Sequence, residues 1–254
     1  MTKTKTIEAT RWSGADWASE KENILLVGVG GIGSWTALNL SRIGHSLYIF
    51  DPDTVDATNV SGGQMYKRED IGTHKVYAVR DICRELGSSS AIEGMDYEYD
   101  EESEALPITI TGLDNMKARK NVFNVWKSQL TNEEIEKKHC LLIDGRLLME
   151  QMEIFAIRGD DEKAIQEYEQ KFLFDDSEAA ELECTAKQTT FAAMIISGLI
   201  TATLCNFLTN KKMGVDFREV PFHQKLFLPL FMHSTKQEAT EEIRIEGVKE
   251  IQKS

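Results

Sequence analysis

The feature that most constrains the fold is the glycine-rich stretch at residues 24–34. Its first four residues are apolar and end at glycine, which is typical of a buried parallel strand. The apolar periodicity continues through residues 35–43 and predicts a helix directly after the turn. Glycines at 28, 30 and 33 permit a tight turn, a close approach of the backbone to a pyrophosphate, and close packing of the helix on the strand. The stretch therefore predicts a nucleotide-binding strand, turn and helix.

A second strand is predicted at residues 46–50 and ends at Asp51, eighteen residues after Gly33. An acidic side chain at this strand end accepts hydrogen bonds from ribose hydroxyls in dinucleotide and mononucleotide sites alike. Its position indicates a nucleotide, and not which one. The polar segment at 53–75 comes directly afterwards. A simple dehydrogenase has little use for such an insertion, whereas a triphosphate site needs extra hydrogen-bond donors there.

A third buried strand is predicted at residues 107–113, with Asp114 at its carboxyl end. Ligands of open parallel sheets bind outside the carboxyl ends of the strands, so Asp51 and Asp114 are expected to converge on one crevice. A second carboxylate beside a triphosphate is best explained by Mg²⁺, which takes hard oxygen ligands and shares them with phosphates. Asn115 fits the N-cap of the next helix, at residues 116–130.

The remaining pattern completes an α/β protein. Helical spacing is found at 75–86 and 161–172, and strands are expected at 139–143 and, as an antiparallel edge strand, at 151–157. Arg146 then follows a strand end, where it binds a substrate carboxylate or is a surface arginine. We expect a Rossmann-like, doubly wound, mostly parallel sheet with helices on both faces and a small C-terminal extension.

The domain organisation is predicted to be a single domain over residues 1–254. Its parts are an N-terminal arm (1–22), a nucleotide-binding core (23–158), an acidic crossover segment with a long buried helix (159–210), and a C-terminal extension (211–254). Within this domain the uncharged run at 189–210 is long enough to raise the possibility of a membrane span. Its threonine, serine and asparagine side chains favour a buried core or dimer-interface helix instead.

Charge and cysteine usage exclude several classes of function. The net charge of -13 opposes binding to nucleic acid and to anionic membranes, which select basic surfaces. The four cysteines form no CxxC pair, which argues against a zinc knuckle or a disulfide framework. The N-terminus also lacks the apolar region of a signal peptide, so we expect a cytoplasmic protein.

Cys184 differs from the other three cysteines, which are expected to be core residues. It stands immediately before the long apolar helix, and Thr185 and Gln188 have the spacing of a capping box. The helix N-terminus and Lys187 favour a thiolate there, whereas Glu183 and the acidic run before it oppose one. Both a reactive thiolate and an ordinary small apolar residue are compatible with this pattern.

Four motifs in order give the chain a specific resemblance. They are Gly28–Ser34, Asp51–Asn59 with Gln64, Ile71–Gly72 with Lys75, and Asp114–Asn115 with Arg119. Together they resemble the ThiF/MoeB/HesA superfamily, to which the adenylation domains of ubiquitin-activating enzymes belong. The resemblance implies that ATP contacts Gly28, Gly30, Gly31, Gly33, Ser34, Asp51, Asp53, Asn59, Gln64 and Lys75. It further implies Mg²⁺ on Asp114 and catalytic roles for Lys75, Arg119 and, as in activating enzymes with a Cys-Thr transfer site, Cys184.

The chain departs from the family pattern before Gln64. The family usually places an arginine there, facing the triphosphate, whereas this chain has Gly62 and Gly63 and one extra residue. Lys67, Arg68 or Arg11 would then have to compensate. This variation, with the segments at 144–146 and 187–191, looks like the ThiF-like proteins carried by bacteriophages and mobile elements.

The implied activity is ATP-dependent activation of a carboxylate as an acyl-adenylate with release of pyrophosphate, optionally followed by thioester transfer to Cys184. The carboxylate would belong to a ubiquitin-like or sulfur-carrier protein, a peptide or a small acid, and the resemblance implies a homodimer. Two alternatives stay open: an NAD-dependent oxidoreductase built on the same glycine turn, and a non-catalytic nucleotide sensor.

Overall fold

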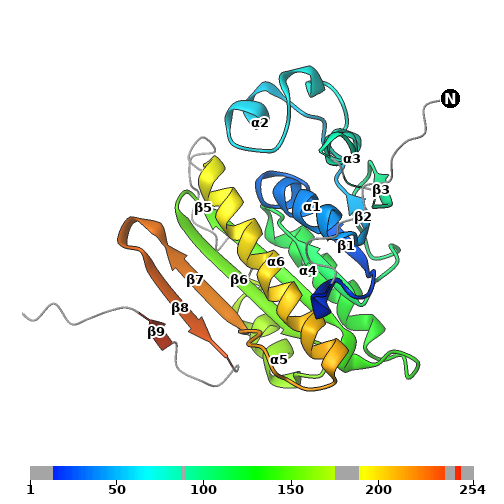
Figure 1. Ribbon diagram of the computed structural model, residues 1–254, viewed down its shortest axis with the longest axis vertical. Coiled ribbons are helices and arrows are strands. Elements are labelled where there is room, and N and C mark those ends of the chain that lie inside the picture. The colour runs from blue at the N-terminus through cyan, green and yellow to red at the C-terminus, as the bar shows by residue number, and fades with distance from the viewer. Residues whose placement is uncertain (1–13, 87, 89, 175–188, 238–243, 247–254) are drawn as a thin grey trace, which may run out of the picture.

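A computed structural model of the protein describes residues 14–86, 88, 90–174, 189–237 and 244–246. One mixed sheet of nine strands crosses the described part of the chain, in the order β3-β2-β1-β4-β5-β6-β7-β8-β9 (Figure 1). The strands are β1 (Asn23–Val27), β2 (Ser46–Phe50), β3 (Ile92–Met95), β4 (Ile108–Thr111), β5 (Leu141–Leu148), β6 (Gln151–Arg158), β7 (His223–Phe227), β8 (Met232–Lys236) and β9 (Arg244–Glu246). The α-helices are α1 (Gly31–Ile43), α2 (Ala57–Ser61), α3 (Lys75–Glu85), α4 (Met116–Gln129), α5 (Glu162–Lys171) and α6 (Thr190–Met213).

The sheet has a parallel half and an antiparallel half. Strands β3, β2, β1, β4 and β5 are parallel, whereas each pairing from β5 to β9 is antiparallel. The chain proceeds from β1 to β2 and β3 on one side and then crosses to β4 on the other side of β1. The strand order therefore reverses between β1 and β4, where doubly wound proteins bind ligands. The predicted α/β class and the C-terminal extension, formed by β7 to β9, are confirmed.

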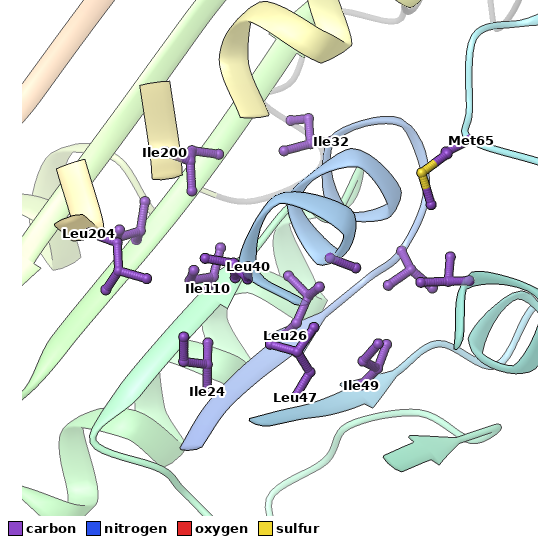
Figure 2. Packing of buried hydrophobic residues seen from close by; sticks show 14 of the residues in the cluster. Ile24, Leu26, Ile32, Leu40, Leu47, Ile49, Met65, Ile110, Ile200 and Leu204 are labelled. Carbon is purple, nitrogen blue, oxygen red and sulfur yellow. The ribbon is translucent and has the colours of Figure 1, made fainter. Parts of the chain in front are cut away.

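Helices cover both faces of the sheet, and the two faces differ in composition. Helices α1, α3 and α6 pack on the face reached by Ile24 and Leu26, where mainly aliphatic side chains interlock (Figure 2). Helices α4 and α5 pack on the opposite face, reached by Leu25 and Val27. Its large buried side chains include Phe123, Trp126, Phe155, Tyr168 and Phe222. We call these the aliphatic face and the aromatic face. The alternation along β1 follows from the two-residue period of a strand.

Helix α6 lies across the aliphatic face beside α1 (Figure 1). Among the described residues it is the one helix long and apolar enough, by length and composition, to cross a membrane, and half of its most apolar window is buried inside the molecule. Ala193, Ile196, Ile200 and Leu204 are fully buried along it. The side of α6 that packs on the sheet is buried, as expected for a core helix.

Three features of the sheet differ from the sequence prediction. Strand β3 was not predicted, because its four residues include a glutamate and a glycine. Strand β5 does not end before Asp144 and continues to Leu148, so Arg146 lies inside a strand rather than at its end. Strand β6 is not an edge strand, because β7 pairs with its free side. The pairing of β5 with β6 over eight residues extends both strands beyond their apolar cores.

Candidate functional site

The glycine turn lies at the point where the strand order reverses. Gly28 has φ +85°, a conformation that favours glycine, and its N–H donates to the Phe50 carbonyl at 2.8 Å. A Cβ on Gly33 would lie 1.9 Å from the Gly28 carbonyl oxygen, so a side chain there is excluded. Gly31 opens α1 and is buried. The turn therefore needs glycine at positions 28 and 33 for its own geometry.

Gly30 is different, because the protein itself does not fill the space beside it. A Cβ there would meet only the Gln64 side-chain amide nitrogen, at 3.9 Å. Gly30 is also the N-cap of α1 and makes no side-chain capping hydrogen bond. The Gln64 amide oxygen is buried without a hydrogen-bond partner among the described residues. An open, positively polarised helix N-terminus beside the Gln64 amide N–H donors fits the phosphates of a nucleotide.

Asp51 fastens the turn from the end of β2. Its carboxylate accepts the Val29 N–H at 2.8 Å and the Asp53 N–H at 3.0 Å. Burial raises the pKa of Asp51, and the nearby Lys75 ammonium opposes that rise. The side chain is thus already engaged with the backbone of the turn. The predicted ribose contact would use the lone pairs that remain on its two oxygens.

Hydrogen bonds hold the segment after α2 against the glycine turn and α1. The Tyr66 hydroxyl donates to the Val29 carbonyl, and the Met65 N–H donates to Ser34 Oγ at 3.1 Å. The Trp35 indole N–H donates to the Gly63 carbonyl at 2.9 Å. These contacts bring Ser34 and Gln64 to the turn, as the motifs predict. Tyr66 and Trp35 were missed, and their proximity to the motifs was the only signal for them.

Lys75 begins α3 with its side chain almost buried, 9% exposed. Its ammonium lies 2.7 Å from Asp53 Oδ2, and the backbone N–H of Lys75 donates to the Asp53 carbonyl at 2.9 Å. Lys75 and Asp53 are thus brought together beside Asp51. Asn59 has a local role, because it forms a reciprocal capping box with Asp56 at the start of α2.

Asp114 lies exposed after β4, and the predicted N-cap Asn115 is confirmed by its acceptance of the Ala118 N–H at 2.8 Å. No cluster of three or more histidine, cysteine or acidic side chains suited to a metal is found among the described residues. Mg²⁺ is commonly held by one or two carboxylates together with substrate phosphates, so Asp114 fits that ion in the presence of a nucleotide.

Arg119 is bound to acceptors on β5 and in the loop after β4. Its buried guanidinium donates to the Asp144 carboxylate and to the carbonyls of Leu113 and Gly145. Arg146 also contacts Asp144, through Nε at 2.7 Å, so it is neither a surface arginine nor available at a strand end. The sequence motif identified Arg119 and gave no signal that it meets a buried carboxylate on β5.

Several predicted residues lie outside the described part of the chain, including Arg11, Cys184 and Lys187. Their roles stay predictions. Of the cations proposed to replace the family arginine, Arg68 is exposed, and Lys67 is paired with glutamates at 69 and 85.

Of the other three cysteines, two match the expectation of core residues and Cys205 matches it only in part. Cys83 and Cys140 are buried and Cys205 is half-buried. Burial raises the pKa of the Cys140 and Cys205 thiols to about 11. Neither thiol is a reactive nucleophile at neutral pH.

Comparison with known proteins gives one family. A model of the ThiF family matches residues 18–246. The chain is 30% identical over 135 residues to the adenylyltransferase and sulfurtransferase MOCS3-1 of Zea mays, covering 50% of this chain. It is 27% identical over 127 residues to the Nedd8-activating enzyme E1 catalytic subunit of Drosophila melanogaster, covering 47% of this chain. It spans 28% of the length of each of these relatives.

Solved structures share the fold at low identity. PaaA matches with a TM-score of 0.63 and 16% identity, over 87% of this chain and 66% of PaaA. E. coli MccB with MccA-N7isoASN matches with a TM-score of 0.62 and 13% identity, over 87% of this chain and 65% of MccB. MccB with ATP matches with a TM-score of 0.56 and 14% identity, over 91% of this chain and 64% of MccB.

Proposed function

The chain belongs to the ThiF family, and on this basis we propose that it is an ATP-dependent adenylyltransferase that activates a carboxylate as an acyl-adenylate. The observation that carries the proposal is the open space at Gly30, where the N-terminus of α1 lies beside the Gln64 amide nitrogen. A nicotinamide cofactor does not require the polar segment at 53–75, part of which is hydrogen-bonded to this turn.

The chemistry needs no general base, because a carboxylate is already ionised at neutral pH. A carboxylate oxygen attacks the α-phosphorus, and the bond from that phosphorus to the bridging oxygen of pyrophosphate breaks. Catalysis is then a matter of positioning and of neutralising charge on the departing pyrophosphate. The backbone N–H groups at 30–33 would cradle phosphate, since that of Ser34 already donates to the Gly30 carbonyl. Lys75 would add a cation, and Asp51 would hold the ribose.

Asp114 would hold Mg²⁺, whose chemical contribution is to neutralise phosphate charge. Asp53 keeps the Lys75 ammonium in place until a nucleotide competes for it. This division of labour predicts that Asp114 governs the metal-dependent part of ATP binding, whereas Gly30 governs binding with or without metal.

For the substrate, we propose a peptide or a ubiquitin-like protein that presents a carboxylate. The support is in the names of similar proteins: a Nedd8-activating enzyme subunit, and MccB solved with MccA. We further propose a cytoplasmic homodimer and, as a second step, attack of the Cys184 thiolate on the acyl-adenylate to give a thioester and AMP. In Cys184→Ala, adenylation should persist and the covalent adduct should disappear; an undiminished adduct would exclude this step.

The test of the nucleotide is the thermal stability of wild type, Gly30→Ala and Asp114→Ala with Mg-ATP, with ATP in EDTA, with AMP and with NAD. A ligand that binds only the folded state adds about 2.7 kcal/mol at a hundred times its dissociation constant. We expect Mg-ATP to stabilise wild type, Gly30→Ala to lose stabilisation by ATP in either condition, and Asp114→Ala to lose only the part that depends on Mg²⁺.

Gly198→Ala is the matched control, because it adds the same methyl group within α6, where a Cβ meets no atom within 4 Å. It should keep full stabilisation by ATP. Stabilisation of wild type by NAD and not by ATP would overturn the proposal in favour of an oxidoreductase. Stabilisation by Mg-ATP without pyrophosphate exchange across a panel of peptides and ubiquitin-like C-termini would favour a nucleotide sensor.

A further inference from the structure

Asp144, inside β5, is a carboxylate with no exposed surface. A buried carboxylate is costly unless it is paired and hydrogen-bonded. It accepts hydrogen bonds from the Arg119 guanidinium, from Arg146 Nε at 2.7 Å and from the Tyr168 hydroxyl at 2.8 Å. Burial raises the pKa of Tyr168, so this hydroxyl remains a donor. Three elements, α4, β5 and α5, therefore meet on one carboxylate.

Arg119 extends this cluster to the loop after β4. Its guanidinium also donates to the Leu113 carbonyl, and Leu113 immediately precedes Asp114. A planar guanidinium holds two acceptors in one fixed geometry, because its donors lie in a rigid fork. The position of Asp144 thereby sets the position of the backbone from which the Asp114 side chain projects.

Arg146 fixes the same carboxylate from the other side. Its Nη2 donates to the Phe172 carbonyl at 2.9 Å, at the C-terminal end of α5, and its guanidinium lies 4.7 Å from the centre of the Phe155 ring. The Phe155 and Phe172 rings in turn pack with centres 4.5 Å apart. Asp144 is therefore anchored to the aromatic face and does not move freely with Arg119.

We propose that Asp144 and Arg119 are positioning residues for the loop that holds Mg²⁺, and that they act on the reaction only through Asp114. The inference rests on the proposed function. It assigns Arg119 a place behind the metal loop rather than against the substrate. Residues behind a metal ligand commonly change metal affinity by about 10–100-fold when they are replaced.

The test measures the dissociation constant of ATP by calorimetry, with Mg²⁺ and with EDTA, for wild type and Arg119→Lys. Lysine keeps a cation for Asp144 but has a single donor centre, so it does not hold the Leu113 carbonyl in the same geometry. We expect the enhancement of ATP binding by Mg²⁺ to fall by about tenfold or more, whereas the dissociation constant in EDTA stays within about twofold. A merely structural role would weaken binding equally in both conditions.

Arg158→Lys is the control, because Arg158 also pairs with two carboxylates but lies opposite Leu141, at the other end of β5. It should leave the Mg²⁺ enhancement unchanged. If Arg119→Lys does not fold, Tyr168→Phe decides, because it keeps the ring and removes one hydrogen bond from Asp144; it should lower the same enhancement severalfold.

The outcomes separate the two proposals. If wild type binds Mg-ATP and the Arg119→Lys or Tyr168→Phe variant keeps the full enhancement of ATP binding by Mg²⁺, this inference is overturned and the proposed function stands. Wild type that binds no ATP in either condition overturns the proposed function and this inference with it.

Discussion

The two faces of the sheet are built on different principles. On the aliphatic face, glycines let backbone and side chains approach closely: a Cβ on Gly112 would lie 3.0 Å from Ile32, and one on Gly145 would lie 2.8 Å from Ile200. Helices α1 and α6 thereby settle against β4 and β5, beside the glycine turn. The close packing of this face depends on glycines, which have no side chain, so added atoms should disrupt it.

The packing of the aromatic face depends on buried charged side chains and on the groups that pair with them. Asp144 and Arg146 face it from β5, and Glu153 on β6 stands opposite Arg146 in the register. Glu153 in turn pairs with Lys225 at 3.0 Å and lies 3.5 Å from His223 Nε2. The His223 ring stacks on Phe155 at 4.1 Å between ring centres. Removing a partner should disrupt this face, because the charge left behind stays buried. Substitutions that add volume should therefore disrupt the aliphatic face, and substitutions that remove a charged partner should disrupt the aromatic face.

The largest effect is expected from Asp144→Ala on the aromatic face. It leaves the guanidinium groups of Arg119 and Arg146 without their shared carboxylate, and breaking a buried pair in this way costs about 3–5 kcal/mol. Urea unfolding monitored by tryptophan fluorescence measures the loss. Asp160→Ala, which removes a partly exposed partner of Arg158, should cost at most about 1 kcal/mol. Equal losses in the two variants would show that the buried cluster does not specify this face.

The sequence predicted the half of the fold in which local signals agree. The strand before the glycine turn, α1 and β2 follow from apolar periodicity, and Gly44 ends α1 in the left-handed conformation at φ 111°. The motif residues that gather at the turn, among them Asp51 and Lys75, were also predicted. The carboxyl ends of neighbouring parallel strands meet at one edge, so position in the chain was enough to place them together.

The rest depends on contacts between segments far apart in the chain. Asp144 reads as the end of a strand, because a carboxylate inside a buried strand is costly until its partners are known. Those partners include Arg119 on α4 and Tyr168 on α5, which are 25 and 24 residues away along the chain. Strand β3 was missed for a similar reason, because its pairing with β2 stabilises it more than its own residues indicate.

A smaller effect is expected from Gly33→Ala, which adds volume on the aliphatic face. Gly33→Ala places a Cβ 1.9 Å from the Gly28 carbonyl oxygen, so the turn has to move. Overpacking of this kind costs about 1–3 kcal/mol, and the stabilisation by Mg-ATP should be lost with the geometry of the turn. Thermal and urea unfolding with and without Mg-ATP measure both effects. Gly198→Ala adds the same methyl group in open space within α6 and should be neutral or stabilising by up to about 1 kcal/mol. Full stabilisation of Gly33→Ala by Mg-ATP would contradict the role of the turn.

The effect of Glu153→Gln depends on pH and is at most about 1.4 kcal/mol for each pH unit. Burial alone would raise the pKa of Glu153, but the neighbouring His223 and Lys225 side chains outweigh it and lower the pKa from 4.5 to about 2. Between these values the unfolded chain binds a proton that the folded protein does not, so stability is present above pH 4.5 and is lost as the pH falls toward 2. One such proton corresponds to a slope of at most about 1.4 kcal/mol per pH unit.

Glu153→Gln should therefore flatten the dependence of the unfolding free energy on pH within this window, as measured by urea unfolding at closely spaced pH values. Glu98→Gln removes the same charge at an exposed site and separates the local contacts from the effect of net charge. Equal slopes in the two variants would mean that the Glu153 contacts contribute nothing specific. A flatter slope in Glu153→Gln alone would show that charge pairing beside Phe155 stabilises the aromatic face, in a way that has no counterpart among the glycine contacts of the aliphatic face.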